Sequence, residues 1–480
     1  MSRGSDPENP ALIAIDLGAE SCRVSLLNWQ AGQPRIFMVR RFENGPEDHG
    51  SGLRWNLDRI CSELDRGLRA CAEVAPQGIA SIGVTGWAVD YVRLDDSGRP
   101  LAPPFCYRDE RTQDAFKAVH AIVPAASLYG ETGVQIQPIN TIYQLYADKS
   151  SGVANSAPWV NLPEYILLWL GAPRIAEYTN ATHTGLIGAE TRQWSGEIFR
   201  ALGLDLAAAP KLVSPGTALG PPRDDLRRLP AFATTQLIAP ACHDTASAIA
   251  GIPERPGAWA YISSGTWSLV GVPLIHTLRS HESYSRGFTN LGAADGGILF
   301  HRGIPGMWLL RQCMNIWDPD RRWSVVQLIE EAQRLPAPDH PLDLDDAALL
   351  PPGDMTARIS EQRKRRGLVP LPAGCEAAPH YANLIFHSLA HRYGVLLREI
   401  EEMTAHRPDH ICVVGGGSQN EYLNALTSAS TGLPVRRCSV ESSTLGNFAI
   451  QWARIEQPSG SLQPQSIADK VSALAEVQIV

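Results

Sequence analysis

The chain has 480 residues, with 42 Lys and Arg against 50 Asp and Glu, and its net charge is −8 at pH 7. An acidic chain without a long run of like charges is a poor candidate for binding nucleic acid or an anionic membrane. Its length is well beyond what a single hydrophobic core usually fills, and 44% of its residues are hydrophobic, so we expect two folded domains.

Nine cysteines are scattered along the chain, and none forms a C-x-x-C pair. This pattern indicates reduced thiols in a cytoplasmic protein and not a disulfide framework or a zinc site. No apolar run approaches the roughly 20 residues that a membrane-spanning helix requires. The first ten residues are polar, so we expect no signal peptide.

Residues 12–27 predict the first pair of strands. One apolar run ends at Asp16-Leu17-Gly18, and a second apolar run begins by Val24. The second run is too short and too alternating to start a helix, which favours a hairpin. A P-loop or a dinucleotide fingerprint needs a helix at this point, so both motifs are excluded.

Similar patterns recur further along the chain. Segments 79–84 and 91–95 predict strands on either side of a turn at 85–90. Segment 259–272 repeats the strand, glycine turn and strand of residues 12–27. Two halves that open with similar hairpins suggest two related domains that face each other across a cleft. The match is short, so duplication remains an open hypothesis at this point.

The last part of the chain predicts helices and one strand. Apolar residues spaced by three and four predict a long amphipathic helix over 384–403. A strand at 411–414 leads into consecutive glycines, and a helix is expected over 420–430. The polar segment after residue 455 is expected to fray.

Three of these glycine turns follow predicted strands and are suited to an anionic ligand, because glycine lets phosphate oxygens approach backbone N–H groups. Ordinary hairpin and strand-to-helix turns are the alternative. Asp16, at the end of its strand, can hold Mg²⁺ through water or simply cap the turn. Arg23 can bind phosphate with two N–H groups or lie exposed on its strand.

Small residues follow His243-Asp244-Thr245 and predict a helix that begins near Thr245. Asp244 is then either the N-cap of this helix or the general base for an alcohol that attacks a phosphoryl group. The pattern alone leaves both roles open. A zinc site at Cys242 and His243 is disfavoured because no second ligand pair has a suitable spacing.

From about residue 11 to 455, the chain resembles the FGGY carbohydrate kinases. The resemblance rests on collinear motifs: Asp16-Leu17-Gly18-Ala19-Glu20-Ser21 with Arg23, Gly86-Trp87-Ala88-Val89-Asp90, Tyr107-Arg108-Asp109-Glu110-Arg111-Thr112, Asn140-Thr141-Ile142-Tyr143-Gln144-Leu145, Glu177-Tyr178-Thr179-Asn180-Ala181-Thr182, His243-Asp244-Thr245-Ala246-Ser247-Ala248, Ser263-Ser264-Gly265-Thr266-Trp267-Ser268, Gly415-Gly416-Gly417-Ser418-Gln419-Asn420 and Leu445-Gly446-Asn447.

This resemblance implies an α/β fold with two ribonuclease-H-like domains of the actin and hexokinase superfamily and an active-site cleft between them. The implied division is an N-terminal domain at 11–241, a C-terminal domain at 242–455 and a tail at 456–480. The implied ligands are ATP, Mg²⁺ and a small ketose. The resemblance leaves the oligomeric state open, with a homodimer as one candidate.

The resemblance also implies residue roles. Asp244 corresponds to the catalytic base, and Asp16 is our candidate for holding the metal. The sugar pocket would contain Gly86, Trp87, Ala88, His243, Asp244 and Thr245. The nucleotide would lie against Ala19, Glu20, Ser21, Cys22 and Arg23 in the first phosphate motif, Thr266 in the second, and Gly415 and Gly416 in the adenosine motif.

Three positions depart from the family pattern. Cys22 stands where the first phosphate loop usually has glycine, and its Cβ is expected to narrow that loop. Gly303 replaces an Asn that contacts ligand in the family, and Arg311 replaces a nearby Gln. We therefore predict ATP-dependent phosphorylation of a ketose primary hydroxyl, with O1 of L-rhamnulose as the first candidate. The alternatives are L-fuculose, a pentulose, or a sugar- or nucleotide-binding protein of the same fold without turnover.

Overall fold

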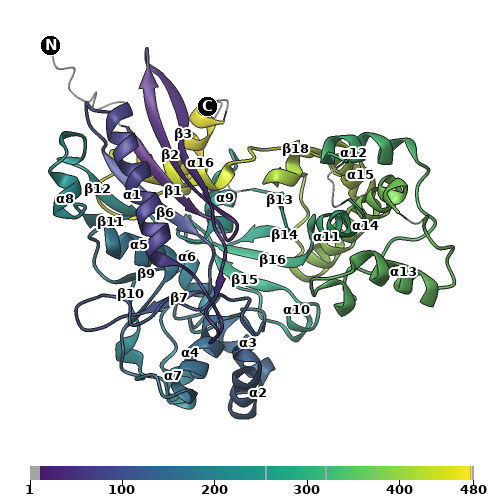
Figure 1. The fold of residues 1–480 in the computed structure, drawn as a ribbon, viewed down its shortest axis with the longest axis horizontal. Helices are drawn as coiled ribbons and strands as arrows, with labels where there is room; N and C mark the ends of the chain where they lie inside the picture. The colour runs from purple at the N-terminus through teal and green to yellow at the C-terminus, as the bar shows by residue number, and fades with distance from the viewer. Residues whose placement is uncertain (1–10, 255–256, 319–321, 373, 476, 478–480) are drawn as a thin grey trace. The chain divides into compact units, whose positions relative to one another are not determined.

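The computed structural model describes residues 11–254, 257–318, 322–372, 374–475 and 477 (Figure 1). The expectation about residues 1–10 therefore lies outside the described residues. The chain divides into two compact units: Met1–Pro256, Leu274–Phe300 and Ser442–Val480 form the first, and Gly257–Pro273 and His301–Glu441 form the second. The predicted domain boundaries at 241 and 455 remain a prediction.

A six-stranded sheet forms the centre of the first unit. Its strands, in spatial order, are β11 (Thr217–Gly220), β12 (Gln236–Ala239), β6 (Ser81–Gly86), β1 (Leu12–Leu17), β2 (Ser21–Gln30) and β3 (Gln33–Glu43). Strand β1 pairs antiparallel with β2 and parallel with β6, and β6 pairs parallel with β12. This register confirms the hairpin predicted at 12–27.

The second six-stranded sheet repeats this topology. Its strands, in spatial order, are β15 (Thr289–Gly292), β16 (Ile298–Pro305), β14 (Trp267–Leu274), β13 (Trp259–Ser264), β17 (His410–Val414) and β18 (Val435–Arg437). Strand β13 pairs antiparallel with β14 and parallel with β17, as β1 does with β2 and β6. Five strands thus follow the same order in both sheets, which confirms the predicted α/β class with two related sheets.

The strands alternate with helices and short two-stranded pairs. In the first unit, the helices are α1 (Leu57–Val74), α2 (Thr112–Ile122), α3 (Ala125–Thr132), α4 (Thr141–Ser150), α5 (Leu162–Leu170), α6 (Tyr178–Ala181), α7 (Gly196–Leu202), α8 (Asp224–Arg227), α9 (Asp244–Ala250), α10 (His281–Ser285), α16 (Ser442–Glu456) and α17 (Pro464–Leu474). In the second unit, they are α11 (Trp308–Trp317), α12 (Val325–Arg334), α13 (Met355–Arg365), α14 (Ala378–Thr404) and α15 (Glu421–Thr431). The short strands are β4 (Glu47–Asp48), β5 (Leu53–Arg54), β7 (Tyr91–Arg93), β8 (Trp159–Asn161), β9 (Ile175–Glu177) and β10 (Lys211–Val213). Among the described residues, none of the helices has the length and hydropathy needed to cross a bilayer.

Strand β1 is buried on both faces because helices cover both sides of its sheet. Ile13 and Ile15 belong to a core cluster with side chains of α1 and α5. Leu12 and Ala14 point to the other face, where they join a cluster with Leu445 and other side chains of α16. Since side chains alternate along a strand, Asp16 extends from the face that carries α16.

Helices α9 and α16 cross at very short range in the first unit. A Cβ added to Gly446 would lie 1.9 Å from the backbone oxygen of Ser247, and one added to Gly251 would lie 2.1 Å from that of Ser442. Real Cβ atoms do not approach backbone oxygens so closely, so only glycine fits at either position. This crossing fixes α9, and with it Asp244, against the sheet.

We therefore expect Gly446→Ala to destabilise the protein by about 1–3 kcal/mol, the usual cost of overpacking, and to lower the melting temperature by several degrees. The matched control is Gly130→Ala in α3, where an added Cβ meets nothing within 4 Å. That control should be neutral or slightly stabilising. Equal melting temperatures for the two variants would show that the helices separate without cost.

The expectation that the chain frays after residue 455 is wrong for the last helix. Helix α17 (Pro464–Leu474) buries Ile467, Val471 and Leu474 at spacings of four and three. Leu474 packs in the same cluster as Phe448 of α16. In the sequence, this helix is indicated only by a few apolar residues at helical spacing within a polar segment.

Candidate active site

Asp16 and Arg23 face each other across the first hairpin. They are Cα partners in the β1–β2 pair, and Nη1 of Arg23 lies 3.0 Å from Oδ2 of Asp16. The Asp16 side chain is 9% exposed, whereas that of Arg23 is 25% exposed. The pair therefore presents a guanidinium toward solvent and holds a carboxylate behind it.

The turn between these strands is tightly held. A Cβ on Gly18 would lie 2.4 Å from the backbone oxygen of Ser21, so the turn closes only with glycine. Asn44 donates to the Gly18 carbonyl at 2.9 Å from its side chain and to the Glu20 carbonyl at 2.9 Å from its backbone. Ala19, Glu20 and Ser21 retain exposure to solvent. A ligand can reach the backbone of this turn.

The Cys22 side chain points away from the exposed face of this turn, and its Sγ lies 3.7 Å from the Gly18 carbonyl oxygen, so a narrowing of the turn by Cys22 stays a prediction. Its side chain is fully buried in the core with Val24. Burial raises the pKa of the Cys22 thiol to about 12. The strand alternation explains this orientation, because Ser21 and Arg23 point to the opposite face. A role for the Cys22 backbone stays a prediction.

His243, and not Asp244, caps helix α9. The Ala246 backbone N–H donates to Nδ1 of His243 at 3.4 Å, and Asp244 is the first helical residue. The structural alternative for Asp244, an N-cap, is therefore wrong. The aspartate is left with its carboxylate at the positive end of the helix.

The Asp244 carboxyl lies at a partly open position beside other polar groups. Oδ1 lies 3.3 Å from Nε2 of His243 and accepts a hydrogen bond from the Thr245 hydroxyl at 3.2 Å. Desolvation, and after it the charge of Asp16, raises the pKa of Asp244 to about 7, although 38% of the side chain stays exposed. Water that reaches the group screens both effects in part. Asp244 thus has the raised proton affinity of a general base.

A buried carboxylate supports the segment that leads into α9. Oε2 of Glu177 accepts hydrogen bonds from the Cys242 backbone N–H at 2.8 Å and the Thr179 hydroxyl at 2.5 Å. The same hydroxyl accepts from the His243 backbone N–H at 3.4 Å. Burial raises the pKa of Glu177 to about 7. Glu177 and Thr179 belong to the motif at 177–182, for which the sequence alone indicates no role.

The predicted wall of the sugar pocket lies beside the same segment. Gly86 forms a parallel bridge with His243, and its N–H donates to the Cys242 carbonyl at 2.9 Å. Trp87 and Ala88 are buried next to Gly86. The structure therefore brings residues 86–88 and 242–244 together, although they are far apart in sequence.

Asp90 fixes the Trp87 side chain. Its Oδ2 accepts from the indole N–H groups of Trp55 at 2.6 Å and Trp87 at 2.9 Å. Val89, which lies in sequence between Trp87 and Asp90, has a φ of +71°, an unusual conformation for a β-branched residue. Its carbonyl accepts from the Thr141 hydroxyl at 2.7 Å, which holds the strained backbone in place.

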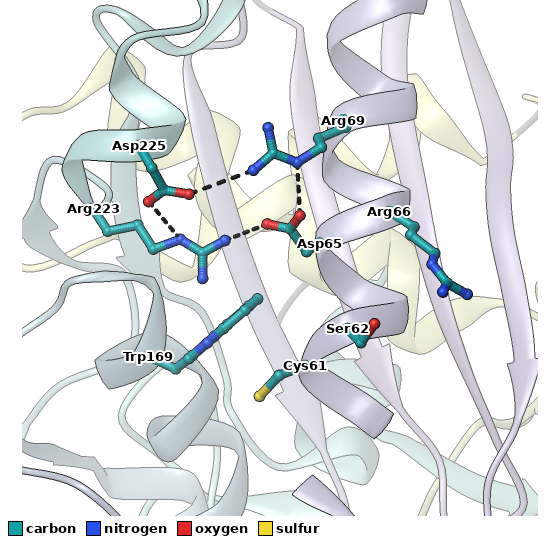
Figure 2. A pocket seen from close by; sticks show the side chains of 8 residues that line it. All are labelled: Cys61, Ser62, Asp65, Arg66, Arg69, Trp169, Arg223 and Asp225. Atoms are coloured by element: carbon teal, nitrogen blue, oxygen red, sulfur yellow. Dashed lines mark hydrogen bonds and ion pairs between the residues drawn. The ribbon is translucent and has the colours of Figure 1, made fainter. Parts of the chain in front are cut away.

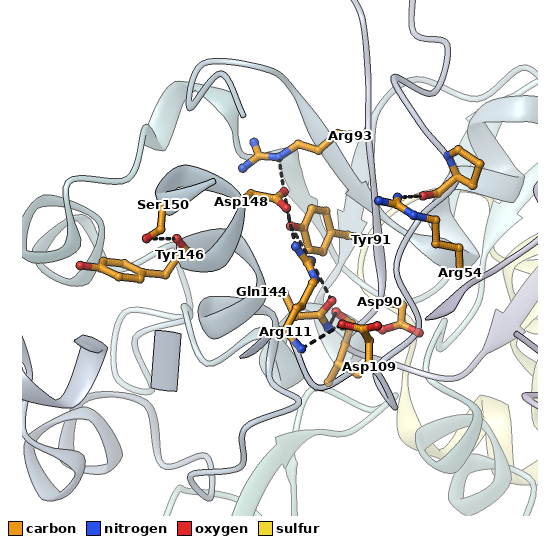
Figure 3. A network of polar contacts seen from close by, with 12 residues as sticks. Arg54, Asp90, Tyr91, Arg93, Asp109, Arg111, Gln144, Tyr146, Asp148 and Ser150 are labelled. Carbon is orange, nitrogen blue, oxygen red and sulfur yellow. Dashed lines mark hydrogen bonds and ion pairs between the residues drawn. The ribbon is translucent and has the colours of Figure 1, made fainter. Parts of the chain in front are cut away.

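A polar network extends outward from Asp90 (Figure 3). The side-chain N–H of Gln144 donates to Oδ1 of Asp90 at 3.2 Å, and the side-chain oxygen of Gln144 accepts from Nη2 of Arg111 at 3.4 Å. Nη1 of Arg111 also pairs with Asp148 at 2.6 Å, and Arg93 pairs with the other oxygen of Asp148 at 3.0 Å. Two of the quoted motifs, at 107–112 and 140–145, therefore support the wall at Trp87 from behind.

Thr266, Gly415 and Gly416 belong to the second unit. The Thr266 carbonyl accepts from the Gly306 N–H at 3.0 Å and the Trp308 N–H at 3.1 Å, which fixes the β13–β14 turn. Gly415 has a φ of +83°, and a Cβ there would lie 2.8 Å from the Ser264 oxygen. Gly416 is exposed, and a Cβ there would meet nothing within 4 Å.

The departures at 302–311 also lie in the second unit. Nη2 of Arg302 pairs with Oδ1 of Asp345 at 2.7 Å. Gly303 is exposed, and a Cβ there would lie 3.0 Å from the Leu269 side chain. The Arg311 guanidinium lies 5.6 Å from the centre of the Trp308 ring.

A surface hollow of about 570 Å³ lies elsewhere in the first unit (Figure 2). Four of its charged groups pair with one another: Arg69 and Arg223 alternate with Asp65 and Asp225 in a closed ring of ion pairs. The Arg223 guanidinium also lies 4.1 Å from the centre of the Trp169 ring. This ring joins α1 to the segment around α8, which is a structural role.

Comparison with known proteins gives consistent matches along the whole chain. The N-terminal and C-terminal domain models of the FGGY family of carbohydrate kinases match residues 11–251 and 260–454. A rhamnulokinase from Enterococcus faecalis is 35% identical over 455 residues, which cover 92% of this chain and 89% of that protein. A rhamnulokinase from Klebsiella pneumoniae is 34% identical over 457 residues, which cover 93% and 90% of the two chains.

Solved structures confirm the fold. A gluconate kinase from Lactobacillus acidophilus has a TM-score of 0.76 at 15% identity, and the match covers 97% of this chain and 96% of that one. Glycerol kinase from Plasmodium falciparum, solved with ADP, has a TM-score of 0.73 at 13% identity, with 96% and 92% covered.

Proposed function

The chain belongs to the FGGY family of carbohydrate kinases, and from this premise we propose that it transfers the γ-phosphoryl group of ATP to O1 of L-rhamnulose. The transfer of phosphate to a sugar follows from the family. The choice of L-rhamnulose is supported by relatives at 31–35% identity that are named rhamnulokinases.

One observation carries the assignment of the base. Asp244 begins α9 next to the wall at Gly86, with one carboxylate oxygen held by Thr245 and with a raised pKa. A sugar hydroxyl that attacks a phosphoryl group needs such a group to accept or orient its proton. Oδ2 of Asp244 would take the proton, because both side-chain partners that the described residues provide lie on Oδ1.

The hairpin residues would complete the charge balance. Arg23 would neutralise charge on the phosphate oxygens, and the exposed turn at 19–21 would offer backbone N–H groups. Asp16 is close enough to raise the pKa of Asp244, so two carboxylates lie near each other, a donor set that fits a divalent cation. Mg²⁺ bound with ATP would supply positive charge at the transferred group.

A coupled assay of ADP release tests this function. We expect ADP release to require Mg-ATP and a ketose, with L-rhamnulose preferred over L-fuculose, L-ribulose and D-xylulose, and with kcat of roughly 1–100 s⁻¹, as in other kinases. Preference for another ketose would correct the substrate and keep the reaction. No ketose-dependent ADP, with binding of sugar and nucleotide intact, would show a binding protein without turnover.

A further inference from the structure

Arg108 belongs to the segment that supports the sugar wall in the first unit. The backbone N–H of the preceding residue, Tyr107, donates at 3.2 Å to Oδ2 of Asp90, the oxygen that also accepts from the indole of Trp87. The Arg108 backbone N–H donates to Sγ of Cys106 at 3.4 Å, which restrains the local backbone. The base of the Arg108 side chain is therefore fixed relative to the wall at Trp87.

The guanidinium of Arg108 is held at one end and accessible at the other. Its Nε donates to the Tyr107 hydroxyl at 3.2 Å, and its carbon lies 5.3 Å from the centre of the Tyr107 ring. Even so, 42% of the Arg108 side chain is exposed to solvent. The contact through Nε orients the planar group, and the Nη atoms can still donate to an anion.

One of these Nη atoms lies next to the first phosphate turn. Nη2 of Arg108 is 4.0 Å from Oε1 of Glu20, whose side chain is 53% exposed. This separation is longer than a hydrogen bond, and exposed ion pairs of this kind contribute little to stability. Arg23, at the same turn, is bonded to Asp16 at 3.0 Å. Arg108 is thus the more weakly held of these two guanidinium groups.

We propose that Arg108 is a phosphate-binding residue that turns from Glu20 to the γ-phosphate of ATP and stays with the phosphoryl group during its transfer. This inference rests on the proposed function. The side chain starts at the sugar wall and ends at the phosphate turn, so its donors lie on the path that the transferred group takes between them. Two N–H groups of one planar cation match the oxygens of a phosphate. Arginine stays protonated, so it supplies positive charge and takes no part in proton transfer.

Two variants should change nucleotide binding in opposite directions. Arg108→Gln removes the cation, and we expect it to weaken binding of the β,γ-imido analogue of ATP about 10-fold, the lower end for a hydrogen bond between charged groups. ADP has no γ-phosphate, so its affinity should stay within about threefold of wild type. Glu20→Gln removes the competing carboxylate and keeps the backbone of the turn, so it should strengthen binding of the analogue about twofold to fivefold. Calorimetric titration with Mg²⁺ present measures all of these affinities.

The matched control is Arg99→Gln. Arg99 has contacts of the same kind, with Nε bonded to the Ser97 hydroxyl at 2.9 Å and an ion pair with Asp95 at 3.4 Å. The control should leave the affinities for both nucleotides unchanged. All three substitutions alter exposed side chains, so each variant should melt within about two degrees of wild type.

Turnover gives a second readout. Arg108→Gln should lower kcat about 100-fold, the lower end for removing one donor to a developing oxyanion, with KM for the ketose within about threefold. Wild-type kcat and affinities in Arg108→Gln would overturn the proposal, as would weaker binding of the analogue in Glu20→Gln. Equal losses for the analogue and ADP, or a raised KM for the ketose alone, would also overturn it, because Arg108 would then contact another part of the substrates. If no ketose is phosphorylated, the proposed function fails, whereas the contrast between the analogue and ADP still decides the role of Arg108.

Discussion

Asp244→Asn should lower kcat by roughly 10²–10⁴-fold, the usual contribution of a positioned base. The amide keeps the shape of the side chain and can still hydrogen-bond, but it cannot accept a proton. Sugar and nucleotide affinities should therefore change far less than kcat. Steady-state kinetics with the preferred ketose, together with direct binding of each substrate, measures both parts of this expectation.

The fold should tolerate this substitution. His243 supplies the N-cap of α9, so replacing Asp244 removes no capping bond. The raised pKa of Asp244 also means that the fold disfavours its negative charge, so a neutral amide should not destabilise the protein. A matched control is Asp224→Asn, because Asp224 is the first residue of α8 and its side chain is 84% exposed. The control should retain full activity.

Turnover by a folded Asp244→Asn enzyme within about threefold of wild type, far above the expected level, would remove Asp244 from the mechanism. Asp16 and Asp90 would then be the next carboxylates to test. Asp16 lies near the end of β1 and close enough to Asp244 to raise its pKa. Asp90, in contrast, is fully buried and already accepts four hydrogen bonds. Asp16 is therefore the stronger replacement.

The strands of both hairpins could be predicted from the sequence because their signals are local. Short apolar runs interrupted by Gly18 or Gly265 define a strand, a turn and a strand without reference to the rest of the chain. The similar order of the two sheets could only be suspected, since pairing of β1 with β6 and of β13 with β17 joins distant segments. The structure settles that point.

Residues that act over long range could not be assigned from the sequence. The Leu445-Gly446-Asn447 motif was noted without a role, and the structure gives it one. Gly446 allows the close crossing of α9, and Asn447 donates to the Gly83 carbonyl in the sheet at 3.3 Å. Gln451, one turn later, donates to the Ile13 carbonyl at 2.9 Å. Such contacts depend on the fold and leave no periodic signal.

Residues 86–88 and 242–244 lie together in the structure, whereas their contacts could be predicted from the sequence only in part. The contact of His183 with His243, 60 residues later, leaves no signal in the local sequence because it depends on the fold. The side chain of Cys22 was expected at the ligand, although strand alternation already pointed it inward once Arg23 was assigned outward. Applying that alternation to the whole strand would have corrected the expectation.

Gly416→Val should weaken ATP binding without affecting the fold. Gly416 is exposed, its φ is outside the positive range, and an added Cβ meets nothing within 4 Å. The protein alone therefore gives no reason for a glycine at this position, whereas a nucleotide lying against the loop would. Overpacking costs about 1–3 kcal/mol, which corresponds to a rise in KM for ATP of roughly 5- to 150-fold.

Gly417→Ala, one residue later, should affect the fold and not only nucleotide binding. A Cβ there would lie 2.0 Å from Oγ of Ser264, so this substitution should lower the melting temperature whether or not nucleotide is present. Gly416→Val should instead melt within a degree or two of wild type, in the range of a surface substitution. Its KM for the ketose should also stay unchanged, because only the nucleotide side is blocked. A wild-type KM for ATP in Gly416→Val would place the adenosine away from this loop, and Gly415 and Gly417 would then serve only the close approach of the loop to Ser264.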